Sequence, residues 1–192
     1  MDTFFLNELK SCCVDINGDR ENAGGISRVL GAYRRIMDFS ELARKEGLLA
    51  LCDACDKLDK SDRTQGFLFR LMMQVVDGYE PAVVSEMGLN MLAADEYHAY
   101  EGLIVLMYYK GACLIQTGVS IDRLGSYMQS LMPQFLREIL QKKEEERSED
   151  DYIKEDDKRD KWVRSLCEDN REVDERDYSI VNQTSLTLLE MS

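Results

Sequence analysis

Apolar residues recur every three or four positions through the first 140 residues of this chain, and only two prolines, Pro81 and Pro133, interrupt the pattern. That spacing produces an apolar stripe along an α-helix, whereas a half-buried strand would need strict alternation. Leu, Met, Ala, Glu and Lys dominate, and runs of β-branched residues are scarce, which also favours helices. We therefore predict an all-α fold, with a single helical domain of about six helices over residues 1–140.

Local signals predict where several helices begin and end. Asp38 followed by Glu41, and Asp62 followed by Gln65, have the form of N-terminal capping boxes. Turn residues at 17–19 and 24–25 mark a loop, Gly78 suits the end of a helix, and Pro81 suits a first turn. We expect helices that begin near residues 2, 26, 40, 63, 81 and 121, the fifth continuing to Gly118 with a break near 95–101.

The most apolar stretch of the chain runs from Gly102 to Val119 and is the one candidate for a membrane span. Lys110 lies at its centre and only eight uncharged residues precede this lysine, against the roughly 20 that a spanning helix needs. We expect a buried core helix instead, and no membrane insertion. Because Met1-Asp2 begins no signal peptide, we expect a cytoplasmic protein with reduced thiols.

The formal net charge is −13, which disfavours nucleic acid and anionic membranes as partners because both require clustered Lys and Arg. A basic protein surface stays open as a partner. Much of the charge lies in residues 141–192, where the stretch 141–177 carries 16 acidic and 10 basic side chains. This acidic segment is either a solvated helix or disordered chain, and its apolar end at 178–191 either docks or does not.

The cysteines raise the question of a metal or thiol site. Cys52 and Cys55 form a C-x-x-C, and Cys12 is followed directly by Cys13. Zinc sites usually combine two spaced pairs in turns, whereas this C-x-x-C falls on a predicted helix. We expect small core or boundary residues and neither metal nor cofactor, with Cys52 and Cys55 as the metal candidates that the sequence offers.

No motif of the sequence indicates an enzyme. His98 stands between Glu96 and Glu101, but no nucleophile lies at motif spacing, so we expect a surface or boundary histidine. The acidic run lacks the turn glycine of a calcium-binding loop, and no phosphate-binding glycine loop is present. The ten methionines fill a helical core or, alternatively, line a groove for a partner helix.

Two segments resemble a known family. The first, ELARKEGLLAL, covers residues 41–51, and the second, FLFRLMMQVVDGYEPAVVSEM, covers residues 67–87. Together they resemble the cytoplasmic part of MotA-type flagellar stator proteins over roughly residues 39–92. In the first segment the matching positions are Arg44, Gly47, Leu48, Leu49 and Leu51, and in the second they are Phe67, Leu68, Val75, Val76, Asp77, Gly78 and Pro81.

The resemblance implies a non-catalytic, helical cytoplasmic module whose charged face contacts the rotor switch protein or a stator complex. The family's membrane helices have no counterpart here, and Cys52 stands where the family pattern has a Glu. The residues that we expect to bind the partner are Arg44, Lys45, Glu46 and Asp53.

A second interpretation keeps the helical module but gives it another purpose. In that case the protein is a helical scaffold or regulatory adaptor unrelated to motility, and its acidic segment binds a basic partner electrostatically. A homo-oligomer is compatible with either interpretation.

Overall fold

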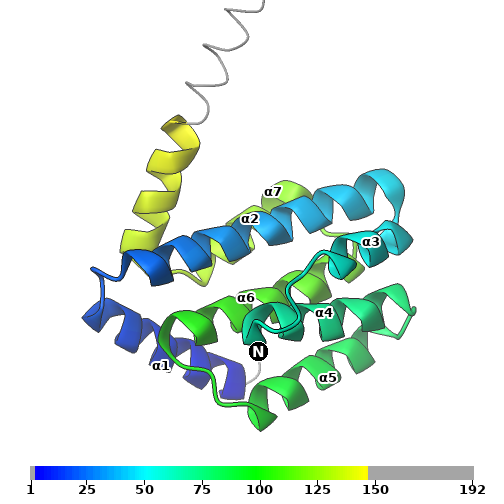
Figure 1. Ribbon diagram of the computed structural model, residues 1–192, viewed down its shortest axis with the longest axis horizontal. Coiled ribbons are helices and arrows are strands. Elements are labelled where there is room, and N and C mark those ends of the chain that lie inside the picture. The colour runs from blue at the N-terminus through cyan, green and yellow to red at the C-terminus, as the bar shows by residue number, and fades with distance from the viewer. Residues whose placement is uncertain (1–2, 147–192) are drawn as a thin grey trace, which may run out of the picture. The chain divides into compact units, whose positions relative to one another are not determined.

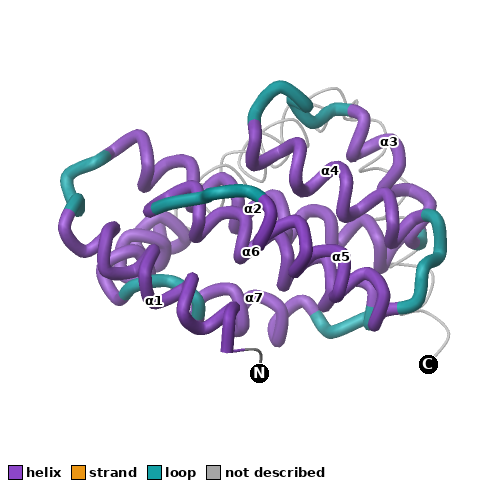
Figure 2. Tube along the Cα trace, turned by 90° about the horizontal axis from the view of Figure 1, so that it is seen from below, coloured by secondary structure: helices purple, strands orange, loops and turns teal. Residues whose placement is uncertain are grey.

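The computed structural model describes residues 3–146, which form helices joined by loops and contain no strand (Figures 1 and 2). The predicted all-α class is therefore confirmed for this part of the chain, although it holds more helices than the six expected. In chain order the elements are α1 (Thr3–Gly18), α2 (Ala23–Glu46), the 3₁₀ helix η1 (Leu48–Ala50), α3 (Leu51–Asp56), α4 (Arg63–Val76), α5 (Pro81–Ala94), α6 (Ala99–Gln116) and α7 (Ile121–Ser130). Residues 134–146 are also helical.

Helix α6 is the centre of the core, as the apolar stretch at 102–119 predicts. Every residue from 102 to 109 is buried, and α6 contacts α1, α2, α4, α5 and α7. Figure 1 shows α6 running between these helices. Within residues 3–146 no helix combines the length and the apolar character that crossing a membrane requires.

Glycines allow α2 and α5 to approach α6 closely. A Cβ added at Gly111 of α6 would lie 2.6 Å from the side chain of Ile36 on α2, and one at Gly88 of α5 would lie 2.5 Å from the ring of Tyr109. Both neighbouring side chains are buried and cannot move aside. The absence of a side chain at these positions is thus explained by packing.

Several helix boundaries lie where the sequence predicts them. Asp62 is the N-cap of α4, and its side chain accepts hydrogen bonds from the backbone N–H groups of Thr64 and Gln65. Gly78 follows the end of α4 with φ of 78°, a conformation that glycine adopts without strain. Pro81 is the first residue of α5, where its missing N–H leaves no hydrogen bond unmade.

Two predicted boundaries are wrong. Asp38 and Glu41 do not begin a helix at residue 40, because α2 continues through them to Glu46 and ends at Gly47, whose φ is 89°. Phe39 is buried and prolongs the apolar stripe of α2 past the capping signal, so tertiary packing outweighs the local motif. The residues 24–25 are likewise not a loop but the first turn of α2, which is capped by the Asn22 side chain.

Residues 1–140 form one compact unit. The acidic segment at 141–192 lies outside the described residues apart from its first six positions, which are helical. The predictions on its order and on the docking of 178–191 concern residues outside the described part.

Candidate functional site

The residues that we expected to bind a partner lie where α2 ends and α3 begins. Arg44, Lys45 and Glu46 form the last turn of α2, and all three are exposed. The chain then turns at Gly47, whose N–H donates to the carbonyl of Ala43 and closes the helix. We name the exposed surface of residues 44–53 the α2–α3 corner.

The charged side chains of the corner differ in whether they form an ion pair within the protein. Lys45 forms an ion pair with Glu41 one turn earlier, and this hydrogen bond raises the pKa of the Lys45 ammonium. The side chains of Arg44 and Asp53 form no hydrogen bond or ion pair with any other residue between 3 and 146. Surface ion pairs are weak, so Lys45 can still bind a partner protein. Arg44 can do so without breaking any ion pair among these residues.

Leu49 is the most exposed large apolar side chain of the corner, at 76%. It lies in η1, between partly buried Leu48 and Ala50. Leu49 is one of the positions that match the family pattern, but its exposure was not predicted. The sequence did contain a signal for this exposure. Two consecutive leucines follow Gly47 in a short 3₁₀ turn, and a single turn cannot direct both side chains into the same core.

The five cysteines between residues 3 and 146 are dispersed over helices α1, α3 and α6. Cys12 and Cys55 are buried, and burial raises the pKa of their thiols to about 12 and about 11 respectively. Cys52 is partly exposed. Among residues 3–146 no three His, Cys, Asp or Glu side chains come together in a way that could hold a metal ion.

His98 is the N-cap residue of α6 and is exposed, but its side chain makes no capping hydrogen bond. It lines a pocket of about 530 Å³ at the start of α2 and α6, which also contains Arg28, Arg63 and Glu101. Both arginines form ion pairs with Glu101, which leaves little free charge for a ligand.

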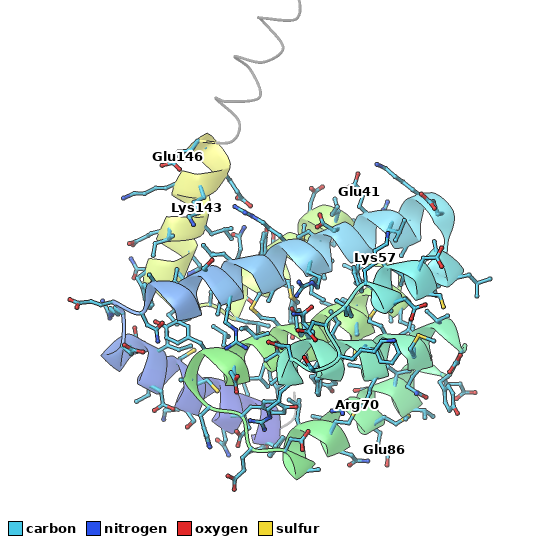
Figure 3. All side chains as sticks on the ribbon, viewed as in Figure 1. Glu41, Lys57, Arg70, Glu86, Lys143 and Glu146 are labelled. Atoms are coloured by element: carbon cyan, nitrogen blue, oxygen red, sulfur yellow. The ribbon has the colours of Figure 1, made fainter. Side chains whose placement is uncertain are left out.

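A second hollow lies between α2 and α3 and was not predicted. Its volume is about 590 Å³. We name it the α2–α3 groove, and its lining residues are Gly31, Arg34, Arg35, Asp38, Phe39, Leu42, Ala54, Lys57 and Leu58. Figure 3 labels Lys57, which follows the last residue of α3.

The groove combines a basic rim with an apolar floor. Phe39 and Leu58 are almost completely buried, whereas Leu42 and Ala54 are partly exposed. Three cationic side chains and one carboxylate line it, whereas residues 1–140 as a whole carry 20 acidic and 14 basic side chains. The groove is thus a positive region on an acidic body.

Arg35 is fixed in place from beneath. Its guanidinium donates a hydrogen bond of 2.6 Å to the hydroxyl oxygen of Tyr108, which lies on α6 and is buried. Burial is the main cause that raises the pKa of Tyr108, so this hydroxyl stays neutral and accepts the bond. The hydrogen bond orders the Arg35 side chain before any ligand arrives.

No protein-family model, curated protein or solved structure matches the chain.

Proposed function

We propose that this protein is a non-catalytic, helical protein-interaction module, and that the α2–α3 corner is a surface that contacts a protein partner. The observation that supports this most is the state of Arg44, an exposed cation without a partner among residues 3–146, on the same short segment as the exposed Leu49 and Asp53. Interface centres commonly combine an arginine with an apolar side chain.

The resemblance of residues 39–92 to MotA-type stator proteins suggests the partner. We propose the flagellar rotor switch protein or a stator complex, contacted through Arg44 with help from Lys45, Glu46 and Asp53. Cys52 is partly buried on α3 and supplies no carboxylate at the family's acidic position. The contact proposed here therefore depends more strongly on Arg44.

Affinity purification of the tagged full-length chain from motile cells tests this assignment. We expect the switch protein or stator subunits to copurify, and Arg44→Glu to weaken the interaction about tenfold or more because it reverses an unpaired cation of the corner. Arg123→Glu is the matched control, since Arg123 is also exposed but lies on α7. Recovery of neither motor protein would end the motility assignment.

A second candidate function rests on composition. The excess of acidic over basic side chains in residues 141–177 favours an adaptor that binds a basic partner. In the full-length chain, replacement of Glu149, Asp150 and Asp151 by Gln, Asn and Asn should weaken such binding at low salt and leave the Arg44-dependent contact unchanged. The opposite pattern favours the corner.

A further inference from the structure

Gly31 in the middle of α2 is not explained by packing. It is exposed, and a Cβ added there would meet no atom within 4 Å. Glycine costs about 1 kcal/mol relative to alanine in a helix interior, and Gly88 and Gly111 show what offsets that cost in the core. At Gly31 the space above the helix opens instead into the α2–α3 groove and into a smaller neighbouring hollow that Asp62 also lines. A missing side chain there keeps the groove open and lets a ligand approach the α2 backbone closely.

The cations of the groove are also unusual for this part of the fold. Between residues 23 and 76, five of the other six Lys or Arg side chains form ion pairs with carboxylates, namely Arg28, Lys45, Lys60, Arg63 and Arg70, and the exception is Arg44 of the corner. By contrast, Arg34 and Lys57 contact no acidic side chain among residues 3–146, and Arg35 donates only to the neutral Tyr108 hydroxyl. Asp38 lines the same groove without neutralising any of the three.

From these observations we infer that the α2–α3 groove binds an acidic segment of a partner protein, in which carboxylates flank an apolar side chain. The carboxylates pair with Arg34, Arg35 and Lys57, and the apolar side chain covers Leu42 above the floor formed by Phe39 and Leu58. The groove goes beyond the proposed function, because it uses a surface separate from Arg44 and a ligand of defined chemistry.

Charge sets the direction in which such a segment lies. Beyond Leu42 the groove adjoins a smaller hollow lined by Asp38, Glu41, Lys45 and Glu46, which is predominantly acidic. A ligand therefore places its carboxylates towards Arg34 and Lys57, and its neutral or basic end towards Glu41.

Other anions fit less well. Nucleic acid binding needs many more cations than three, and the acidic charge of the surrounding body repels a polyanion. A free phosphate would use the cations but not the apolar floor. An acidic peptide with one apolar anchor uses both.

Selection from a displayed library of random 12-residue peptides, carried out on the immobilised full-length protein, tests this inference. We expect enriched peptides to carry Asp or Glu around a Leu, Ile, Met or Phe. The decisive variant is Gly31→Leu, which fills the groove from an exposed helix position and should abolish the enrichment. Ser27→Leu adds the same side chain to α2 at an exposed position outside the groove and should leave the enrichment intact.

Fluorescence anisotropy of one enriched peptide then measures the electrostatic part. Arg34→Glu and Lys57→Glu should each weaken binding about tenfold, and 0.5 M NaCl should weaken it as well. Circular dichroism verifies that the variants are folded. Enrichment of peptides without acidic residues, or equal binding to the Gly31→Leu protein, would overturn the inference. Arg44→Glu should not change peptide binding, so failure of the groove and failure of the corner are distinguishable.

Discussion

The two sides of α2 differ in what lies above a glycine. On the side that packs against α6, Ile36 of α2 occupies the space above Gly111 of α6. Towards the groove, Gly31 is open, and Arg34 has no carboxylate partner among residues 3–146. Packing therefore explains the glycine at the α2–α6 contact, whereas no contact within the fold explains Gly31 and the unpaired Arg34 on the other side of α2.

The largest effect should come from breaking the packed side. Gly111→Leu places a side chain into the space occupied by buried Ile36, so we expect a loss of about 3 kcal/mol in the free energy of unfolding. Urea denaturation followed by circular dichroism measures it. The same substitution at Gly31 should cost nothing. Similar losses of stability at Gly111 and Gly31 would show that the α2–α6 contact and the groove side of α2 are not different.

A smaller effect should come from the charged N-cap of α4. Burial alone would raise the pKa of Asp62, but hydrogen bonds from Thr64 and Gln65 and the charge of Arg28 outweigh it and lower the pKa. A lowered pKa stabilises the folded state at pH values above 3.8, the ordinary pKa of the carboxyl group. This contribution is lost as the pH falls below 3.8 and through the lowered pKa of the folded state. Asp62→Ala should therefore cost about 1 kcal/mol at pH 7.

Asp62→Asn separates the cap from the charge. Asparagine also caps a helix, so most of the stability at pH 7 should remain, while the part that depends on pH disappears. Denaturation curves at pH 7 and pH 3 measure both quantities. An Asp62→Asn protein that loses as much stability on acidification as the wild type would contradict this role for the carboxylate.

The smallest effect should be a gain. Gly31→Ala adds a methyl group in open space on a helix, so we expect about 0.5–1 kcal/mol of additional stability. Thermal unfolding should show a higher Tm. No change, or a loss, would mean that Gly31 has a structural role that the contacts do not reveal. A gain in stability together with weaker peptide binding would sharpen the distinction between the two sides of α2.

Local signals in the sequence were sufficient for several features of the fold. Asp62 caps α4, Pro81 begins α5, and the apolar stretch that contains Gly102 forms the buried helix α6. These features depend on residues close together in the chain. The signal at Asp38 failed because the burial of Phe39, which depends on distant helices, prolongs α2.

The candidate sites show the same limit. The sequence predicted Arg44 and Asp53 within one helix that begins near residue 40, whereas the structure places Arg44 in the last turn of α2 and Asp53 in the first turn of α3, both exposed. The sequence did not predict the α2–α3 groove, because Arg34 and Lys57 are far apart in the chain. They line the same groove only because α3 folds back beside α2. Gly31, a glycine within a helical pattern, was the one local indication of the groove. Its significance is clear only in the structure, where no neighbouring side chain fills the space above it.

The hydrogen bond between Arg35 and Tyr108 has a consequence for how a ligand is recognised. Withdrawal of the guanidinium would leave a buried hydroxyl unsatisfied, at a cost of about 1–3 kcal/mol, so Arg35 keeps this bond when a ligand is present. Arg34 and Lys57 have no such tie and can adjust their positions. The groove thus offers one cation in a fixed position, Arg35, and two cations that can move, Arg34 and Lys57. Its ligands should therefore share one invariant carboxylate that pairs with Arg35, while the residues on either side of this carboxylate vary.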